Sequence, residues 1–179
     1  MLFVNVANMA TSTVRRSGDE VKSADDPYAT LFGMKVVIVS GYFNPLHGGH
    51  LDMIEAARAM GDKLIVIVNN DKQQVMKKGK IILDEKNRLR LMRALRDVNE
   101  VVLSVDTEDM SQVKTLEMIA KQHPGDELLF ANGGDRDSEQ AIPEAAVCHQ
   151  YGIEMRFDAG TGKPDSSSRI NQATGHETV

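Results

Sequence analysis

Residues 35–52, KVVIVSGYFNPLHGGHLD, hold the pattern from which the fold can be predicted. The first six residues are mostly β-branched, which is typical of a buried strand. A turn follows at Asn44, and a pair of glycines then separates two histidines, His47 and His50, just where a helical pattern begins. Histidines at such a junction can bind a metal, pack in a core or contact a phosphate, and the rest of the chain has to distinguish these roles.

Runs of the same kind recur along the chain and alternate with helical patterns. The predicted strands are residues 35–40, 64–69, 100–105, 127–131 and 153–157. The predicted helices are residues 50–60, 83–98, 111–123 and 139–151. In the clearest of them, LDEKNRLRLMRALRDV, Asp84 can cap the amino end, and the residues that recur on one face are Leu89, Met92, Leu95 and Val98.

Near-continuously apolar strands separated by crossover helices call for a parallel sheet that is covered on both faces. The predicted fold class is therefore α/β, with a Rossmann-like, doubly wound, parallel five-stranded sheet in a single domain over residues 34–179. Residues 1–33 mix small, polar and charged residues without a period, so we expect a mobile N-terminal extension there. Ligands of such sheets bind at the carboxyl ends of the strands.

The composition of the 179 residues narrows the function further. With 41% hydrophobic and 26% charged residues it is typical of a globular protein, and the longest apolar runs are far below the roughly 20 residues that span a bilayer. A formal net charge of -5 argues against a nucleic-acid-binding surface. The single cysteine, Cys148, favours a structural role and a cytoplasmic location. We therefore expect neither a membrane nor a nucleic acid among the partners.

Four of the predicted strand ends are rich in glycine, cations or hydroxyl groups, as a phosphate site requires. They are GYFNPLHGGH, NNDKQQVMKKGK, NGGDR and GTGKPDSSSR, after the first, second, fourth and fifth strands. The second of these segments is interpreted as a loop that carries lysines around Gly79. All four segments follow the carboxyl ends of predicted strands, where ligands are expected.

Of the three roles for the histidines, phosphate contact is favoured. The amino end of a helix offers unpaired N–H groups and the positive end of a dipole. An imidazole there can donate a hydrogen bond to an oxygen whose charge grows in a transition state, worth ~3 to 4 kcal/mol. A catalytic zinc usually takes three protein ligands, and no Cys/His cluster accompanies His47 and His50 in the sequence. Packing in the core remains an alternative.

Residues 47–50, HGGH, resemble the HxGH signature of the nucleotidyltransferase superfamily, and PDSSSRI near the carboxyl end is similar to its serine- or threonine-rich motif. The resemblance runs from residue 34 to about residue 174. It is greatest to the cytidylyltransferase-like branch, which holds glycerol-3-phosphate and ethanolamine-phosphate cytidylyltransferases and the heptose-phosphate adenylyltransferase. Three further segments, AARAMGDKLIVIVNND, RDVNEVV and NGGDR, are similar to elements of that branch.

The resemblance implies a reaction without a covalent intermediate, in which a substrate phosphate attacks the α-phosphorus of a nucleoside triphosphate and pyrophosphate leaves. It assigns catalytic roles to His47, His50, Lys78, Lys80 and Arg169. It assigns nucleotide binding to Gly41, Tyr42, Phe43, Gly49, His50, Arg96, Gly134, Asp135, Arg136, Lys163, Ser166, Ser167 and Ser168. Mg²⁺ would arrive with the triphosphate, and no metal ligand is assigned to the protein.

Several of these positions also have ordinary structural explanations. The lysines around Gly79 can belong to a solvated loop, and the serine run can open a capped surface helix. NGGDR can be a turn with Asp135 and Arg136 on the surface; alternatively its glycines approach a base or ribose while Arg136 binds a phosphate or carboxylate. Arg96 can contact a base or a neighbouring subunit.

Two positions depart from the cytidylyltransferase pattern GTFD, because Tyr42 stands at the Thr position and Asn44 at the acidic one. The serine run is also preceded by GTGKPD and not by the usual Arg-Thr-Glu-Gly. We predict transfer of a nucleoside monophosphate, CMP in preference to AMP, from a nucleoside triphosphate to a small phosphorylated acceptor. The alternatives are an adenylyltransferase acting on a sugar phosphate or cofactor precursor, an inactive nucleotide-binding sensor, and a histidine-ligated metal protein. The resemblance also implies a homodimer.

Overall fold

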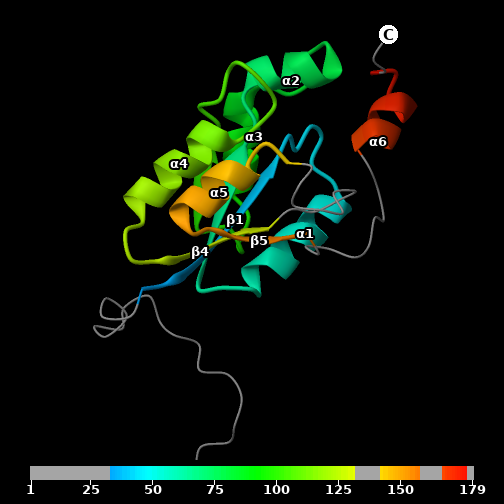
Figure 1. Ribbon diagram of the computed structural model, residues 1–179. Helices are drawn as coiled ribbons and strands as arrows, with labels where there is room; N and C mark the ends of the chain where they lie inside the picture. The colour runs from blue at the N-terminus through cyan, green and yellow to red at the C-terminus, as the bar shows by residue number, and fades with distance from the viewer. Residues whose placement is uncertain (1–32, 132–141, 158–166, 177–179) are drawn as a thin grey trace, which may run out of the picture.

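Five parallel strands form one sheet in the order β3-β2-β1-β4-β5 in the computed structural model, which describes residues 33–131, 142–157 and 167–176 (Figure 1). The strands are β1 (Lys35–Gly41), β2 (Lys63–Val68), β3 (Glu100–Leu103), β4 (Glu127–Ala131) and β5 (Glu154–Arg156). In the register, Val37 lies opposite Leu64 on one side and Leu129 on the other. The chain winds outward from β1 to β3 and then crosses to the other side of β1. The predicted doubly wound, five-stranded α/β fold is confirmed.

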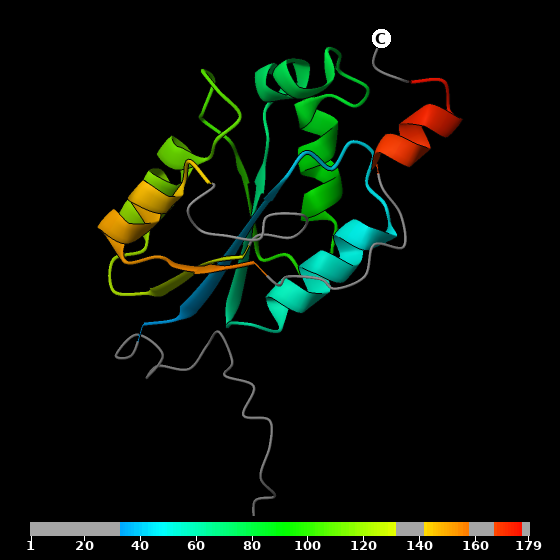
Figure 2. The ribbon, with the colours of Figure 1, turned by 45° about the vertical axis from the view of Figure 1, so that its right-hand side comes forward.

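Helices cover both faces of the sheet, which explains why the strands are apolar at nearly every position. Helices α1 (Gly48–Arg58) and α3 (Glu85–Arg93) pack on one face, against Val37 and Val39 of β1. Helices α4 (Val113–Gln122) and α5 (Ala145–Tyr151) pack on the other face, against Val36 and Ile38, and Figure 2 shows the two layers apart. Cys148 of α5 is fully buried in this second cluster, as its expected structural role requires.

All four predicted helices differ from the structure in their bounds, and two of them, α3 and α5, are much shorter than predicted. The carboxylate of Asp84 accepts the N–H of Asn87 at 2.8 Å and caps α3 as predicted, but α3 already ends at Arg93. Leu95 and Val98 therefore follow the helix, although both still pack against its core cluster. Helix α5 begins at Ala145, not at residue 139, because a residue that precedes a proline, here Ile142, is biased away from helical conformation.

The prediction of a lysine-bearing loop after β2 is wrong, because residues Asp71–Lys78 form helix α2. Asn70 and Gln73 make a reciprocal capping box at its amino end. Gly79 ends the helix with a φ of 71°, a left-handed conformation that glycine adopts without a Cβ penalty. Helix α2 stands beyond the carboxyl ends of the strands and not on a face of the sheet, with α6 (Ser167–Ala173) near it (Figures 1 and 2).

Within the described ranges no helix combines the length and apolar character that crossing a membrane would need. The predicted N-terminal extension lies outside the described residues, except for Gly33. Its mobility, and the single-domain boundary at residue 34, stay predictions.

Candidate active site

The loop between β1 and α1 has a strained turn at Phe43, whose φ is 49°. A left-handed backbone is costly for an aromatic residue and is kept where the surroundings enforce it, often at functional sites. The turn folds the Phe43 ring back over Gly41, where an added Cβ would lie 2.7 Å from the ring. We expected Gly41 to admit a ligand; on the side of the missing Cβ the structure places the fully buried Phe43 ring instead.

His47 and His50 stand together at the first turn of α1. Their rings are stacked, with centroids 3.8 Å apart, and the edge of Phe43 meets the His50 ring at a centroid distance of 5.0 Å. Burial, and then the neighbouring His47, lower the pKa of His50 to about 4. His50 is therefore neutral at pH 7, so it can act on an anion by donating an N–H and not by carrying charge.

The surroundings of the pair suit an anion. The first N–H groups of an α-helix have no partner within the helix, and no acidic side chain stands in the first turn of α1. Among the described residues, the buried Nδ1 of His50 and the buried Nδ2 of Asn44 have no hydrogen-bond partner. Polar atoms of this kind are uncommon in folded proteins and indicate a missing ligand or water.

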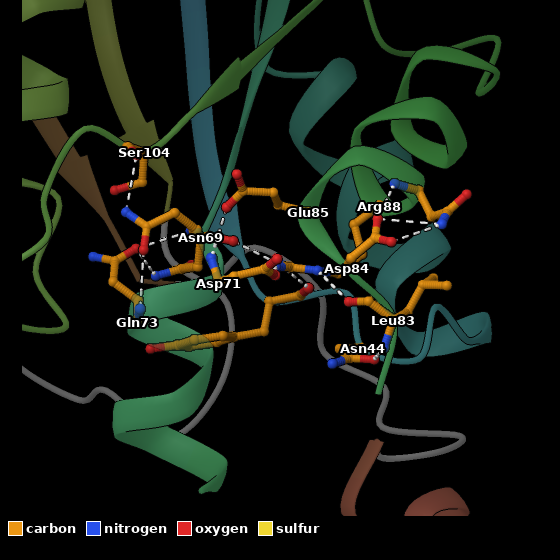
Figure 3. A network of polar contacts seen from close by, with 12 residues as sticks. Asn44, Asn69, Asp71, Gln73, Leu83, Asp84, Glu85, Arg88 and Ser104 are labelled. Atoms are coloured by element: carbon orange, nitrogen blue, oxygen red, sulfur yellow. Dashed lines mark hydrogen bonds and ion pairs between the residues drawn. The ribbon is translucent and has the colours of Figure 1, made fainter. Parts of the chain in front are cut away.

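Arg88 of α3 is fully buried and ties the strand ends together (Figure 3). Its Nη1 donates to the carbonyl oxygens of Tyr42 at 3.0 Å and Asn69 at 2.6 Å, so it bridges the ends of β1 and β2. Its Nε donates to the carbonyl of Leu83, and Nη2 makes an ion pair with Asp71 at 2.6 Å. One guanidinium thus positions the histidine loop, the start of α2 and the segment before α3.

A second group of polar side chains fixes α2 from the other side (Figure 3). Asn70 Nδ2 donates to the carbonyl of Ser104 at 3.0 Å, and the side chain of Gln73 donates to the carbonyl of Ser111 at 2.7 Å. Asn44 Oδ1 accepts the N–H of Leu83 at 3.1 Å, which links the histidine loop to the chain that follows α2. The bonds of Asn70 and Gln73 thus hold the amino end of α2 in place beside the site.

Helix α6 closes the site from the far end of the chain. Ser167 Oγ donates to the carbonyl of Pro45 at 3.1 Å, and Asn171 Nδ2 reaches the carbonyl of Asn44 at 3.5 Å. Lys78 Nζ, at the end of α2, donates to Ser168 Oγ at 3.2 Å. A pocket of about 250 Å³ lies between these elements, lined by Lys78, Lys80, Ile82, Ser168, Asn171, Gln172 and His176.

The structure brings together several of the predicted site residues but not all. His47, His50 and Gly49 share the first turns of α1, while Lys78, Lys80 and Ser168 line the pocket next to their loop. Arg169 is exposed on α6 beside Ser168. The predicted residues outside the described ranges are Gly134, Asp135, Arg136, Lys163 and Ser166.

Arg96 lies near the amino ends of the strands, at the other end of the sheet from the histidines. It comes just before β3, and its neighbour Asn99 accepts the N–H of Leu64 at the start of β2. The Arg96 side chain is 90% exposed. Within one chain Arg96 therefore lies away from the histidines, which are at the carboxyl ends of the strands, and this position does not favour contact with a base bound there.

Sequence reasoning did not identify Arg88, Asn171 or the contact of Lys77 with Tyr42. Lys77 Nζ lies 4.6 Å from the centroid of the Tyr42 ring, a cation–π contact. A signal for Arg88 was present, because it stands four residues before Met92 and so on the apolar face of its helix. For Asn171 no local pattern exists, since its partner is far away in the sequence.

Comparison with known proteins identifies related sequences. The profile of the cytidylyltransferase-like family matches residues 38–172. A bifunctional protein HldE of Azorhizobium caulinodans is 32% identical over 114 residues, which are 58% of this chain and 24% of that protein. An FAD synthase of Ferroglobus placidus is 42% identical over 77 residues, 43% of this chain and 49% of that protein. The chain thus spans about a quarter and about half of these two relatives.

A solved structure has the same architecture. The lipopolysaccharide core biosynthesis protein of Thermoplasma volcanium is 27% identical, with a TM-score of 0.56 over 70% of this chain and 94% of that one. The match covers almost all of that protein, so the described fold corresponds to a complete unit there.

Proposed function

The chain belongs to the cytidylyltransferase-like family, and we propose that it transfers a nucleoside monophosphate from a nucleoside triphosphate to a small phosphorylated acceptor, releasing pyrophosphate. One observation carries this proposal. The Lys78–Ser168 contact joins the segment after β2 to the serine-bearing helix α6, and α6 in turn bonds the loop of the stacked histidines. Three segments with phosphate-binding chemistry are thereby gathered at one edge of the sheet.

In the proposed reaction an oxygen of the acceptor phosphate forms a bond to the α-phosphorus, and the bond from this phosphorus to the bridging oxygen of the β-phosphate breaks. His50, neutral at pH 7, donates an N–H to an α-phosphate oxygen and is oriented by the Phe43 edge and the His47 ring. The amino end of α1 stabilises the same charge. Lys78 and Lys80 neutralise the leaving pyrophosphate from the pocket beside α6.

Mg²⁺ is proposed to enter as part of the triphosphate substrate. Among the described residues there is no group of three or more His, Cys, Asp or Glu side chains that could hold a metal. Mg²⁺ keeps several waters and binds substrate phosphates, so it needs few ligands from the protein.

The nucleotide is proposed to be ATP or CTP. The departures at Tyr42 and Asn44 left CTP only narrowly preferred on sequence. One relative is named FAD synthase, and the product in that name contains an adenylyl group. This supports ATP as the donor for the present chain. ATP is therefore the first donor to test, with CTP beside it.

The test is release of pyrophosphate from the full chain with Mg²⁺. Each of ATP, CTP, GTP and UTP is combined with glycerol 3-phosphate, phosphoethanolamine and several sugar 1-phosphates, and pyrophosphate is measured with a coupled assay. We expect one donor to exceed the others with a phosphorylated acceptor present. Tight nucleotide binding without release in any combination would contradict the proposal and leave a nucleotide-binding sensor.

Two features of the assembly and setting stay predictions. A homodimer, which the resemblance implies, is to be measured by analytical ultracentrifugation. A cytoplasmic location is to be checked by fractionation of cells that express the full chain.

A further inference from the structure

Two adjacent glutamines of α2, Gln73 and Gln74, are both fully buried but differ completely in their hydrogen bonds. Gln73 Oε1 accepts from Asn69 Nδ2 at 3.0 Å and from the N–H of Asn70 at 3.2 Å. Its Nε2 donates to the carbonyls of Ser111 at 2.7 Å and Asp109 at 3.2 Å. Among the described residues, neither Oε1 nor Nε2 of Gln74 has any partner. The hydrogen bonds of the fold explain why Gln73 is buried, but they do not explain the burial of Gln74.

Gln74 shares a face of α2 with residues that contact other parts of the candidate site. Residues three and four apart lie on the same face of a helix. Gln74 follows Asp71 by three residues and precedes Lys77 and Lys78 by three and four. Asp71 bonds Arg88, Lys77 lies over the Tyr42 ring, and Lys78 bonds Ser168. Gln74 is therefore at the centre of the face that α2 turns toward the end of β1 and α6.

A buried amide without partners lowers stability, because its desolvation is not offset by hydrogen bonds. Natural proteins rarely keep such a group unless a ligand or an ordered water completes it. Gln74 is uncharged and offers both a donor and an acceptor, which match a hydroxyl group better than a phosphate, for which lysines stand nearby.

The acceptor is a better source of that hydroxyl group than the nucleotide. In-line transfer places the acceptor and the leaving pyrophosphate on opposite sides of the phosphorus. Lys78 and α6 stand on the proposed pyrophosphate side, and Gln74 lies one helical turn away from their contact, toward Asp71 and Arg88. On the basis of the proposed function, we propose that Gln74 determines acceptor specificity by hydrogen bonding a hydroxyl group, so that the acceptor is a sugar or polyol phosphate.

The test compares Gln74→Met with Gln73→Met in the full chain by binding and by thermal unfolding. Calorimetry measures the affinities for glycerol 3-phosphate, ribose 5-phosphate and glucose 1-phosphate, and for methyl phosphate, which has no hydroxyl group. We expect the wild type to bind one hydroxylated phosphate more tightly than methyl phosphate. Gln74→Met should weaken that ligand roughly tenfold and leave methyl phosphate and ATP unchanged, as loss of one or two neutral hydrogen bonds predicts.

The melting temperatures separate a substrate role from a structural one. Gln74→Met should keep or raise the melting temperature, because it removes a buried amide without partners, whereas Gln73→Met should lower it by several degrees. Gln74→Leu is measured in parallel and decides the matter should the first variant not fold.

Several results would overturn the proposal. These are an unchanged affinity of the hydroxylated ligand in the Gln74 variants, a loss of ATP affinity in its place, or a fall in melting temperature as large as that of Gln73→Met. No preference of the wild type for any hydroxylated phosphate over methyl phosphate would also overturn it. Because binding is measured without turnover, absence of pyrophosphate release in the wild type contradicts the proposed function and is distinguishable from each of these results.

Discussion

Lys78 Nζ donates a hydrogen bond to Ser168 Oγ over 3.2 Å, although the two residues are 90 positions apart in the chain. The neighbouring Lys77 lies over the ring of Tyr42, 4.6 Å from its centroid. The two adjacent lysines at the carboxyl end of α2 therefore make different contacts. Lys78 faces the pocket, and Lys77 holds α2 against the end of β1.

The first prediction concerns the charge that Lys78 brings to the pocket. Lys78→Met should weaken binding of ATP and of pyrophosphate roughly tenfold or more, because hydrogen bonds to charged groups contribute more than neutral ones. Calorimetry at a fixed ionic strength provides the measurement. Lys72→Met is the matched control, since Lys72 is exposed on another side of the same helix and should leave both affinities unchanged. Equal losses in the two variants would show a general charge effect and not a pocket contact.

The second prediction concerns His50 as a preorganised donor. His50→Ala should lower kcat by ~100-fold or more, the scale expected when one such donor is removed from a transition state. Steady-state pyrophosphate release measures it, with His149→Ala, exposed on α5, as the control. An unchanged rate would remove His50 from the catalytic assignment.

The third prediction follows from the lowered pKa of His50. The folded protein keeps His50 neutral down to about pH 4, whereas the unfolded chain protonates it near pH 6.5. Between these values the unfolded state binds the additional proton, so stability falls as the pH is lowered from about 6.5 to about 4. Urea unfolding across this range should show a steeper loss of stability in the wild type than in His50→Gln. The imidazole signal of His50 in an NMR titration should have its midpoint far below those of exposed histidines.

The fourth prediction concerns Arg88 as the group that joins the strand ends. Arg88→Met leaves the carbonyls of Tyr42 and Asn69 and the carboxylate of Asp71 without their partner. The free energy of unfolding should fall by about 3–5 kcal/mol, as when one member of a buried ion pair is removed. Chemical denaturation measures this, and Arg90→Met, on an exposed part of the same helix, should change stability little. A small effect at Arg88 would mean that the bonds of Asn70 and Gln73, with the N–H of Asp71 donating to Glu85, are sufficient to position α2.

The fifth prediction concerns the packing of Phe43 on Gly41. An alanine Cβ at residue 41 would stand 2.7 Å from the Phe43 ring, so Gly41→Ala should cost about 1–3 kcal/mol and displace the ring from His50. Activity should fall together with stability. The double variant Gly41→Ala/Phe43→Leu should lose less stability than the two single changes added together, because the smaller side chain relieves the same contact. Strict additivity of the two stability losses would show that contact with the Phe43 ring does not cause the loss at Gly41.

Local patterns were sufficient for most of the elements. The strands of the sheet and the cap of α3 at Asp84 were predicted because their determinants lie within a few residues of each other. The same holds in principle for α2, whose capping box at Asn70 and Gln73 and terminal Gly79 are written in the sequence. The high lysine content of that segment favours a solvated loop, but the capping box and the terminal glycine are the stronger local signals and define a helix.

The sequence by itself determined the parallel α/β fold and the histidine pair at the start of α1, and it predicted a candidate site at the carboxyl ends of the strands. Those features depend on periodicity and on short-range geometry. Only the tertiary structure decided that Lys78 bonds Ser168 while Lys77 lies over Tyr42. It also decided that, within the described part of the chain, Gln73 is hydrogen bonded and the side chain of Gln74 is not. Adjacent residues of one type are equivalent in any local pattern, and they become different only through partners such as Ser168 and Ser111, which folding brings from distant parts of the chain.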